Sequence, residues 1–213
     1  MSTSCAAILV SGLLLSATGL SASVIPVVNP SFETPPAGGF PLACGSNCSF
    51  SDATIPGWST PAESGQIMQS VSPGPLFNFI PDGVTTAFSN GGTISQTVGP
   101  TVLVGTVYTL TVELGHRNDL PFTASADLLV GGQTFAATGT PPTPGNWSTF
   151  TATFTGSAAN VGDTITIQLN TSGFQGNFDN VQLTAVPEPG YAGLLGLVGL
   201  PAIAYFRRRR TAR

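Results

Sequence analysis

The chain has 213 residues, of which 41% are hydrophobic and only 8% are charged. It contains no lysine, and residues 24–185 hold nine acidic side chains against one arginine, a formal charge of −8. So acidic a domain repels phosphate backbones, which argues against nucleic acid as a partner, and lysine-dependent catalysis is excluded. The 26 glycines and 18 prolines predict many turns, as in an all-β protein.

The N-terminus has the pattern of a secretory leader. Residues 6–20 form an apolar run that is followed by small residues. This pattern predicts a signal peptide over residues 1–23, with cleavage after Ala22 or Ser23, and hence export of the domain that follows. No basic residue precedes the run, and the alternative is a buried N-terminal helix.

Short strands between turns are predicted for the body of the chain. Several alternate between apolar and polar residues, as in 108–114 and 164–169, and Gly131-Gly132 predicts a tight hairpin. We expect strands at 23–28, 66–70, 85–89, 93–98, 107–115, 122–130, 133–138, 147–155, 164–169 and 177–184. Residues 24–185 are therefore expected to form one β-sandwich or jelly roll.

Cys44 and Cys48 are the cysteines that remain after removal of the leader. An even number in an exported chain predicts a disulfide, which would stabilise so short a loop by about 2 kcal/mol at most. Zinc is the weaker interpretation, because the sequence offers no two further ligands nearby.

Two tryptophans are candidates for ligand contact. The flat rings of Trp58 and Trp147 could stack on sugar rings, but tryptophan in such a domain is more often part of the core. Trp58 follows Pro56-Gly57, which favours a ring that closes one end of the sandwich.

The polar stretch 115–119 directly follows a predicted strand, where recognition loops commonly lie. Here His116 is the only histidine of the chain, and Arg117 is the only cation of the body. Both are candidate ligand-binding residues, with Arg117 suited to an acidic sugar or a carboxylate. The alternative is an internal ion pair between Arg117 and Asp119, Asp127 or another acid.

Catalytic motifs are missing from the sequence. It has no Gly-x-Ser-x-Gly, no His-Glu-x-x-His and no phosphate-binding loop, and no spacing singles out a pair of glycosidase carboxylates. We therefore expect no enzyme. Hydrolysis and ice binding are distant alternatives, and ice binding lacks the regular threonine repeat that it would need.

An ordered set of short motifs covers most of the body: NPSFE at 29–33, IPGW at 55–58, ISQTV at 94–98, YTLTV at 108–112, Trp147 and FDNVQL at 178–183. This order resembles carbohydrate-binding modules of the galactose-binding-domain-like jelly-roll group. The resemblance implies a structural calcium ion with Glu33 and Asp179 as ligands. The alternative is that both acids are solvated or cap turns.

The C-terminal residues 186–213 have three parts. VPEPG at 186–190 is followed by an uncharged run at 191–206 and by a basic tail at 207–213, which contains Arg207, Arg208, Arg209 and Arg210. At 1.5 Å per residue the run predicts a short transmembrane helix with the arginines in the cytoplasm, and the alternative is a buried helix.

This tail resembles the PEP-CTERM sorting signal, which is also called the ice-binding protein C-terminal domain. The resemblance implies a Gram-negative bacterium, recognition by an exosortase near Pro187, Glu188 and Pro189, and a transient anchor in the inner membrane. It also implies delivery to the cell surface or extracellular matrix.

Together these patterns predict an exported surface protein whose body is a non-catalytic module that binds carbohydrate, in particular exopolysaccharide. The alternative is a structural or adhesive protein of the biofilm matrix that has no discrete ligand.

Overall fold

The computed structural model describes residues 21–188. The leader up to residue 20, the apolar run 191–206 and the terminal arginines lie outside the described residues, as does Pro189. In the part of the chain that is described, no helix is long and apolar enough to cross a membrane.

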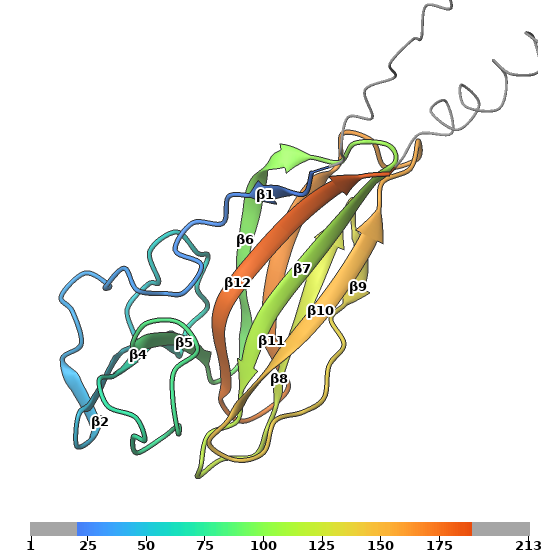
Figure 1. Ribbon diagram of the computed structural model, residues 1–213. Helices are drawn as coiled ribbons and strands as arrows, with labels where there is room; N and C mark the ends of the chain where they lie inside the picture. The colour runs from blue at the N-terminus through green and yellow to red at the C-terminus, as the bar shows by residue number, and fades with distance from the viewer. Residues whose placement is uncertain (1–20, 189–213) are drawn as a thin grey trace, which may run out of the picture.

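The described chain is built from strands that form two antiparallel sheets (Figure 1). Their bounds are β1 Ser23–Ile25, β2 Leu42–Gly45, β3 Cys48–Ser51, β4 Ser64–Gln69, β5 Thr85–Ser89, β6 Gly92–Thr101, β7 Thr106–Gly115, β8 Ala124–Val130, β9 Gln133–Ala136, β10 Trp147–Thr155, β11 Thr164–Thr171 and β12 Gly176–Pro187. The larger sheet has the order β10-β7-β12-β5-β4-β3-β2, with β1 paired to β12, and the smaller sheet has the order β6-β11-β8-β9.

The main core lies between the two sheets. In β7, Tyr108, Leu110, Val112 and Leu114 are buried and alternate with partly exposed residues. The inner face of β11 is provided in the same way by Ile165 and its alternate neighbours. This period of two is the one that the sequence predicts, because successive strand side chains point to opposite faces. The prediction of an all-β sandwich is therefore confirmed.

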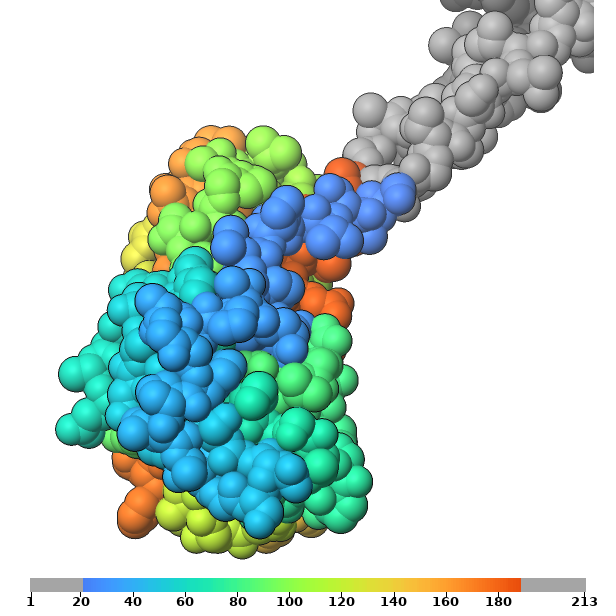
Figure 2. Space-filling model, turned by 90° about the vertical axis from the view of Figure 1, so that its left-hand side faces the viewer, coloured from blue at the N-terminus to red at the C-terminus, as the bar shows by residue number. Residues whose placement is uncertain are grey.

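The larger sheet continues beyond the sandwich. Strands β2 to β5 and their loops form a lobe beside β12, β7 and β10 (Figure 1). Figure 2 shows that the N-terminal part of the body, coloured blue to green, gathers on one face of the molecule. The lobe thus covers part of the sheet face that points away from the sandwich core.

One difference from the predicted elements matters for the site. Strands β2 and β3, which contain the two cysteines, are not among the strands predicted from the sequence. The expected hairpin is present, with Gly131 and Gly132 both at positive φ between paired Val130 and Gln133, as a type I′ turn requires.

Candidate functional site

A second apolar cluster lies outside the sandwich core. Its buried members are Cys48, Ile67, Leu76, Phe77, Phe88 and Trp147, and Cys44, Phe50 and Ile80 pack against them. We call these residues the lobe cluster. Alternation explains why β5 contributes to both cores: Ala87 faces the sandwich, and its neighbour Phe88 faces the lobe. The lobe cluster therefore lies between the outer face of the larger sheet and the loop 70–84.

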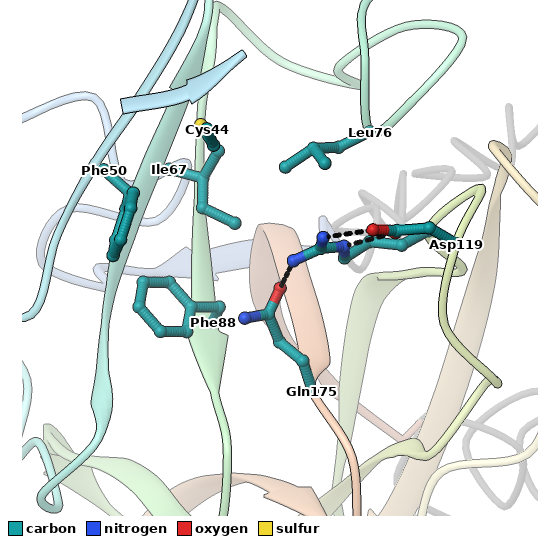
Figure 3. A pocket seen from close by; sticks show the side chains of 8 residues that line it. Cys44, Phe50, Ile67, Leu76, Phe88, Asp119 and Gln175 are labelled. Carbon is teal, nitrogen blue, oxygen red and sulfur yellow. Dashed lines mark hydrogen bonds and ion pairs between the residues drawn. The ribbon is translucent and has the colours of Figure 1, made fainter. Parts of the chain in front are cut away.

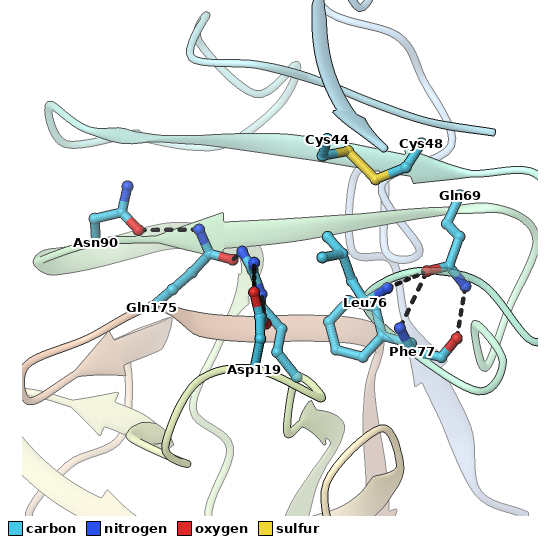
Figure 4. A network of polar contacts seen from close by, with 9 residues as sticks. Cys44, Cys48, Gln69, Leu76, Phe77, Asn90, Asp119 and Gln175 are labelled. Carbon is cyan, nitrogen blue, oxygen red and sulfur yellow. Dashed lines mark hydrogen bonds and ion pairs between the residues drawn. A yellow bond between two sulfur atoms is a disulfide. The ribbon is translucent and has the colours of Figure 1, made fainter. Parts of the chain in front are cut away.

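The loop 70–84 is held by one buried glutamine at the end of β4. The Oε1 atom of Gln69 accepts hydrogen bonds from the backbone N–H groups of Leu76 and Phe77, both at 3.1 Å. Its Nε2 donates to the carbonyl oxygens of Phe77 at 2.9 Å and Val71 at 3.2 Å (Figure 4). Gln69 thereby fixes the positions of two apolar residues of the lobe cluster.

The tryptophan of β10 closes the cluster from the side of the sandwich. The ring centroids of Trp147 and Phe77 are 4.8 Å apart, and the Trp147 indole N–H donates to the carbonyl oxygen of Phe79 at 2.9 Å. This ring is part of a packed wall. The interpretation of Trp147 as an open sugar platform does not fit its burial.

A cavity of about 260 Å³ opens between the lobe and the sheet (Figure 3). One side is apolar and the other carries a guanidinium, a carboxylate and an amide. The lining residues are Cys44, Phe50, Ile67, Leu76, Phe88, Arg117, Asp119 and Gln175. This combination of apolar walls and a few convergent polar groups is typical of a small-molecule site.

The polar side is a connected network. The Arg117 guanidinium donates twice to the Asp119 carboxylate, at 2.9 and 2.7 Å, and once to Gln175 Oε1 at 2.7 Å. Gln175 in turn donates to Asn90 at 3.0 Å (Figure 4). The Arg117 side chain is 15% exposed and that of Asp119 is 54% exposed. The alternative of an internal pair with Asp119 is thus the one that the structure adopts, and this pair lies at the cavity.

Hydrogen bonds from Arg117 lower the pKa of Asp119, partial burial opposes this shift, and the Arg117 charge adds to the lowering. Asp119 is therefore a carboxylate at neutral pH. It offers hydrogen-bond acceptors to a bound molecule and is a poor source of protons.

The other sequence candidates lie elsewhere. Trp58 is buried in the sandwich core beside Phe32, with ring centroids 5.4 Å apart, and its indole N–H donates to Asn29. The His116 ring bonds the carbonyl oxygen of Pro142 at 2.8 Å, packs near Phe122 and is not among the lining residues of the cavity. The structure therefore places two of the candidate ligand-binding residues at this site: Arg117 lines the cavity, and Trp147 supports its wall. Trp58 and His116 do not line it.

Cys44 and Cys48 form a disulfide that joins β2 to β3. Cys44 lines the cavity and Cys48 belongs to the lobe cluster. The bridge therefore fixes the outer edge of the lobe at the site (Figure 4).

A cluster of acids lies where the first and last parts of the body meet. Glu33 Oε1 accepts from the backbone N–H groups of Val84 and Thr85 at 3.0 and 2.6 Å, and Asp179 accepts from Asp82 N–H at 3.0 Å. The pKa of Asp179 is raised to about 8, chiefly by burial and to a smaller extent by the charges of Asp82 and Glu33, against the lowering effect of backbone hydrogen bonds from Asp82 and Asn180.

This acid cluster fits a cation in charge but only partly in geometry. The carboxylates of Glu33, Asp82 and Asp179 carry like charges close together, although burial is the main cause of the raised pKa of Asp179. Among residues 21–188, however, no group of three or more His, Cys, Asp or Glu side chains is arranged to hold a metal ion. A calcium ion here would need backbone carbonyls and water as additional ligands, which Ca²⁺ readily accepts.

Sequence reasoning missed three polar residues near the junction between the lobe and the larger sheet. Gln69, Gln175 and Asn177 carry no motif, and two of them lie at strand ends where a polar residue is unremarkable. The sequence did place Asn177 next to the apolar Phe178 in a predicted strand, so the two side chains were expected on opposite faces of the sheet. Which residues would surround Asn177 depends on the sheet order, which the sequence does not show.

The family model described as HpiC1-like, HpiC1 cyclase, matches residues 23–184. A crystal structure of the Stig cyclase Fisc from Fischerella sp. TAU, in complex with (3Z)-3-(1-methyl-2-pyrrolidinylidene)-3H-indole, has a TM-score of 0.65 at 23% identity, over 79% of this chain and 100% of that chain.

Two further structures are similar. An apo cyclase from Fischerella sp. has a TM-score of 0.65 at 24% identity, over 79% of this chain and 98% of that one. A cyclase from Fischerella sp. TAU with 4-(1H-indol-3-yl)butan-2-one has a TM-score of 0.62 at 23% identity, over 78% and 99%. At this identity the structures establish a shared fold. No curated protein matches.

These findings correct the functional predictions made from the sequence. The match to a cyclase family overturns the expectation of a non-catalytic carbohydrate-binding module, and with it that of a structural matrix protein that is not an enzyme. It also overturns the recognition of the chain as a PEP-CTERM protein, since no sorting domain is shown. Exosortase, the inner membrane and exopolysaccharide are therefore withdrawn as partners. The motifs were misread because they describe the fold, and one fold hosts many functions.

Proposed function

Because the chain belongs to the HpiC1-like cyclase family, we propose that it closes a ring in a small, largely apolar molecule bound in the cavity beside Arg117 and Asp119. The observation that carries this proposal is the cavity itself, in which apolar walls face a single ion pair. We also propose the finer fold assignment, namely that the strands of the sandwich are connected as in a jelly roll.

The apolar walls would act on the shape of the substrate. Phe50, Phe88 and Leu76 enclose a flexible molecule from three chain segments, and water is excluded where they meet it. Holding two reacting atoms of one molecule close together removes much of the entropic cost of ring closure. The rigid support of these walls, Gln69 and the disulfide, keeps that geometry constant.

The ion pair would orient the polar part of the substrate. The Arg117 guanidinium donates hydrogen bonds and can stabilise negative charge that develops on an oxygen. The Asp119 carboxylate accepts a hydrogen bond from an N–H or O–H group of the substrate. Because the pKa of Asp119 is lowered, this carboxylate binds and orients at neutral pH.

A planar aromatic substrate suits the cavity. Phe50 and Phe88 have ring centroids 6.2 Å apart and meet edge to face, so their rings offer both a face and an edge to a bound ring. The ligands of the two Fischerella complexes are indole compounds. We therefore take an indole derivative as the first probe of this site.

Binding of 4-(1H-indol-3-yl)butan-2-one, measured by isothermal titration calorimetry, tests the proposal. The Leu76→Trp variant fills the cavity and should weaken binding at least tenfold. Leu103→Trp is the matched control, because Leu103 is 61% exposed and outside the lining. Saturable binding that both variants retain would show that the compound binds elsewhere and would contradict the proposal.

We also propose that the acid cluster of Glu33, Asp82 and Asp179 holds a structural calcium ion. The support is the convergence of these carboxylates on the 82–85 backbone, where Asp179 accepts from Asp82 N–H and Glu33 from Val84 and Thr85 N–H, so that a cation there would compensate several like charges. The ion would tie the start of the body to β12. Export of the domain stays a prediction from the sequence.

A further inference from the structure

One side chain next to the cavity has no partner for its polar atoms. Asn177 in β12 is completely buried, and both its Nδ2 and its Oδ1 lack a hydrogen-bond partner among the described residues. The only other such buried side-chain atom in residues 21–188 is Gln66 Oε1, and the Gln66 amide nitrogen bonds the carbonyl oxygens of Phe32 and Thr34. Asn177 is thus the one amide there with neither end satisfied.

The strand register places this amide at the lobe cluster. Asn177 is paired with Phe88 of β5 on one side and with Gly115 of β7 on the other. Its neighbour Phe178 faces the sandwich core, so Asn177 faces the lobe. Directly paired side chains have β-carbons about 4.5–5.5 Å apart. Because Phe88 lines the cavity, the Asn177 amide lies one side chain away from it.

The residues around Asn177 offer its amide no hydrogen-bond partner. Phe88 flanks it on one strand, on the other the Trp147 ring lies over Gly115, and the Asp179 carboxylate on the same strand accepts from Asp82 and Asn180 instead. A buried donor or acceptor without a partner is penalised. The contrast with Gln69 is direct, since Gln69 is equally buried and makes four hydrogen bonds.

We propose that Asn177 is a specificity-determining residue that binds the substrate through both ends of its amide. The free Nδ2–H group of Asn177 needs an acceptor, and its free Oδ1 needs a donor. A ligand meets both needs if it carries a carbonyl oxygen next to an N–H group, as on the edge of a lactam or a secondary cis-amide. The aromatic walls select a planar ring that carries this edge. The inference rests on the proposed function, because it assigns the substrate class of the same cavity.

The amide has no exposed surface in this structure, so binding must move a wall side chain aside. The side chain to be displaced is that of Phe88, which is paired with Asn177 across β12 and β5 and lines the cavity. An amide does not titrate in the accessible pH range. The role of Asn177 is therefore recognition and orientation, and the preference it causes should not depend on pH between 6 and 8.

Two probes of similar shape test this inference: quinolin-2(1H)-one, which carries a lactam edge, and naphthalene, which does not. We expect the wild-type chain to bind quinolin-2(1H)-one at least tenfold more tightly than naphthalene, as two net hydrogen bonds allow. In Asn177→Leu the two affinities should become equal through loss of quinolin-2(1H)-one binding, with naphthalene binding unchanged or stronger.

Stability provides a second readout. Asn177→Leu should leave Tm unchanged or raise it, because it removes two unpaired polar atoms. If the larger side chain prevents folding, Asn177→Ala serves in its place. A preference that persists in these variants, or no preference in the wild type, overturns the inference and leaves the proposed function intact. Failure of all aromatic probes to bind the wild type contradicts both.

Discussion

The indole ring of Trp147 lies against the backbone of Gly115: a β-carbon on Gly115 would lie 2.7 Å from two carbons of the ring. The two residues are paired across β10 and β7, and Gly115 is also the partner of Asn177 on β12. The absence of a side chain at Gly115 therefore allows the ring to lie flat at the junction between the sheet and the lobe.

Gly115→Ala is expected to displace this ring. Forcing an extra carbon into a packed site typically costs about 1–3 kcal/mol, and urea denaturation should show a loss of this size. Gly99→Ala is the matched control, since Gly99 is also in a strand and a β-carbon there meets nothing within 4 Å. Equal stability of the two variants would show that the Trp147 ring is not confined.

Gln69→Leu should loosen the loop 70–84. Loss of the amide leaves the backbone N–H groups of Leu76 and Phe77 without partners, at a cost of about 2 kcal/mol or more. Hydrogen exchange should become faster at the amides of these two residues and stay unchanged in β11. Unchanged exchange in the loop would contradict the role given to Gln69.

Arg117→Met is expected to separate binding from stability. The Asp119 partner is more than half exposed, so loss of the ion pair should change the free energy of unfolding by at most about 1 kcal/mol. Affinity for 4-(1H-indol-3-yl)butan-2-one, whose ketone can accept from the guanidinium, should fall about tenfold. Unchanged affinity would remove Arg117 from the site.

Stability in the absence of divalent cations should decrease between pH 4 and pH 8. The pKa of Asp179 is raised from about 3.8 to about 8, so the folded chain holds a proton that the unfolded chain has lost in this range. Millimolar calcium should raise Tm, and more at pH 8 than at pH 5, because it competes with that proton. The proposed calcium site is wrong if Tm is the same in calcium and in chelator.

Replacement of both cysteines by alanine tests the disulfide. A bridge between Cys44 and Cys48 closes a short loop, so its loss should cost about 2 kcal/mol at most. Because Cys44 lines the cavity, binding of the indole probe should weaken as well. Two reactive thiols in the unreduced protein would show that the bridge does not form.

The sequence predicted the sandwich better than the lobe. Alternation in β7 and β11 is visible without a structure, because one face of each strand is buried and the other is not. Strands β2 and β3 have no such alternation, since they pack on a loop and not on a second sheet. β2 pairs with β3 as a short hairpin, and β3 pairs with the next strand, β4.

Of the site, the sequence identified single residues but not their grouping. Arg117 was singled out as the only cation of the body, and its pairing with Asp119 was one of two alternatives. Its proximity to Phe88 and Asn177 arises from the sheet order β7-β12-β5, which no local pattern encodes. For the same reason the motifs indicated a fold that many proteins share and gave the wrong function.

The most direct test of the central claim is methyl NMR of the chain during titration with 4-(1H-indol-3-yl)butan-2-one. Ile67 and Leu76 line the cavity, whereas Ile165 and Ile167 lie in the sandwich core and serve as internal controls. A binding site in the cavity predicts saturable shifts of the Ile67 and Leu76 methyl signals and none at the two controls. Saturable shifts confined to other parts of the chain, or no saturable shift at all, would contradict the assignment of this cavity as the active site.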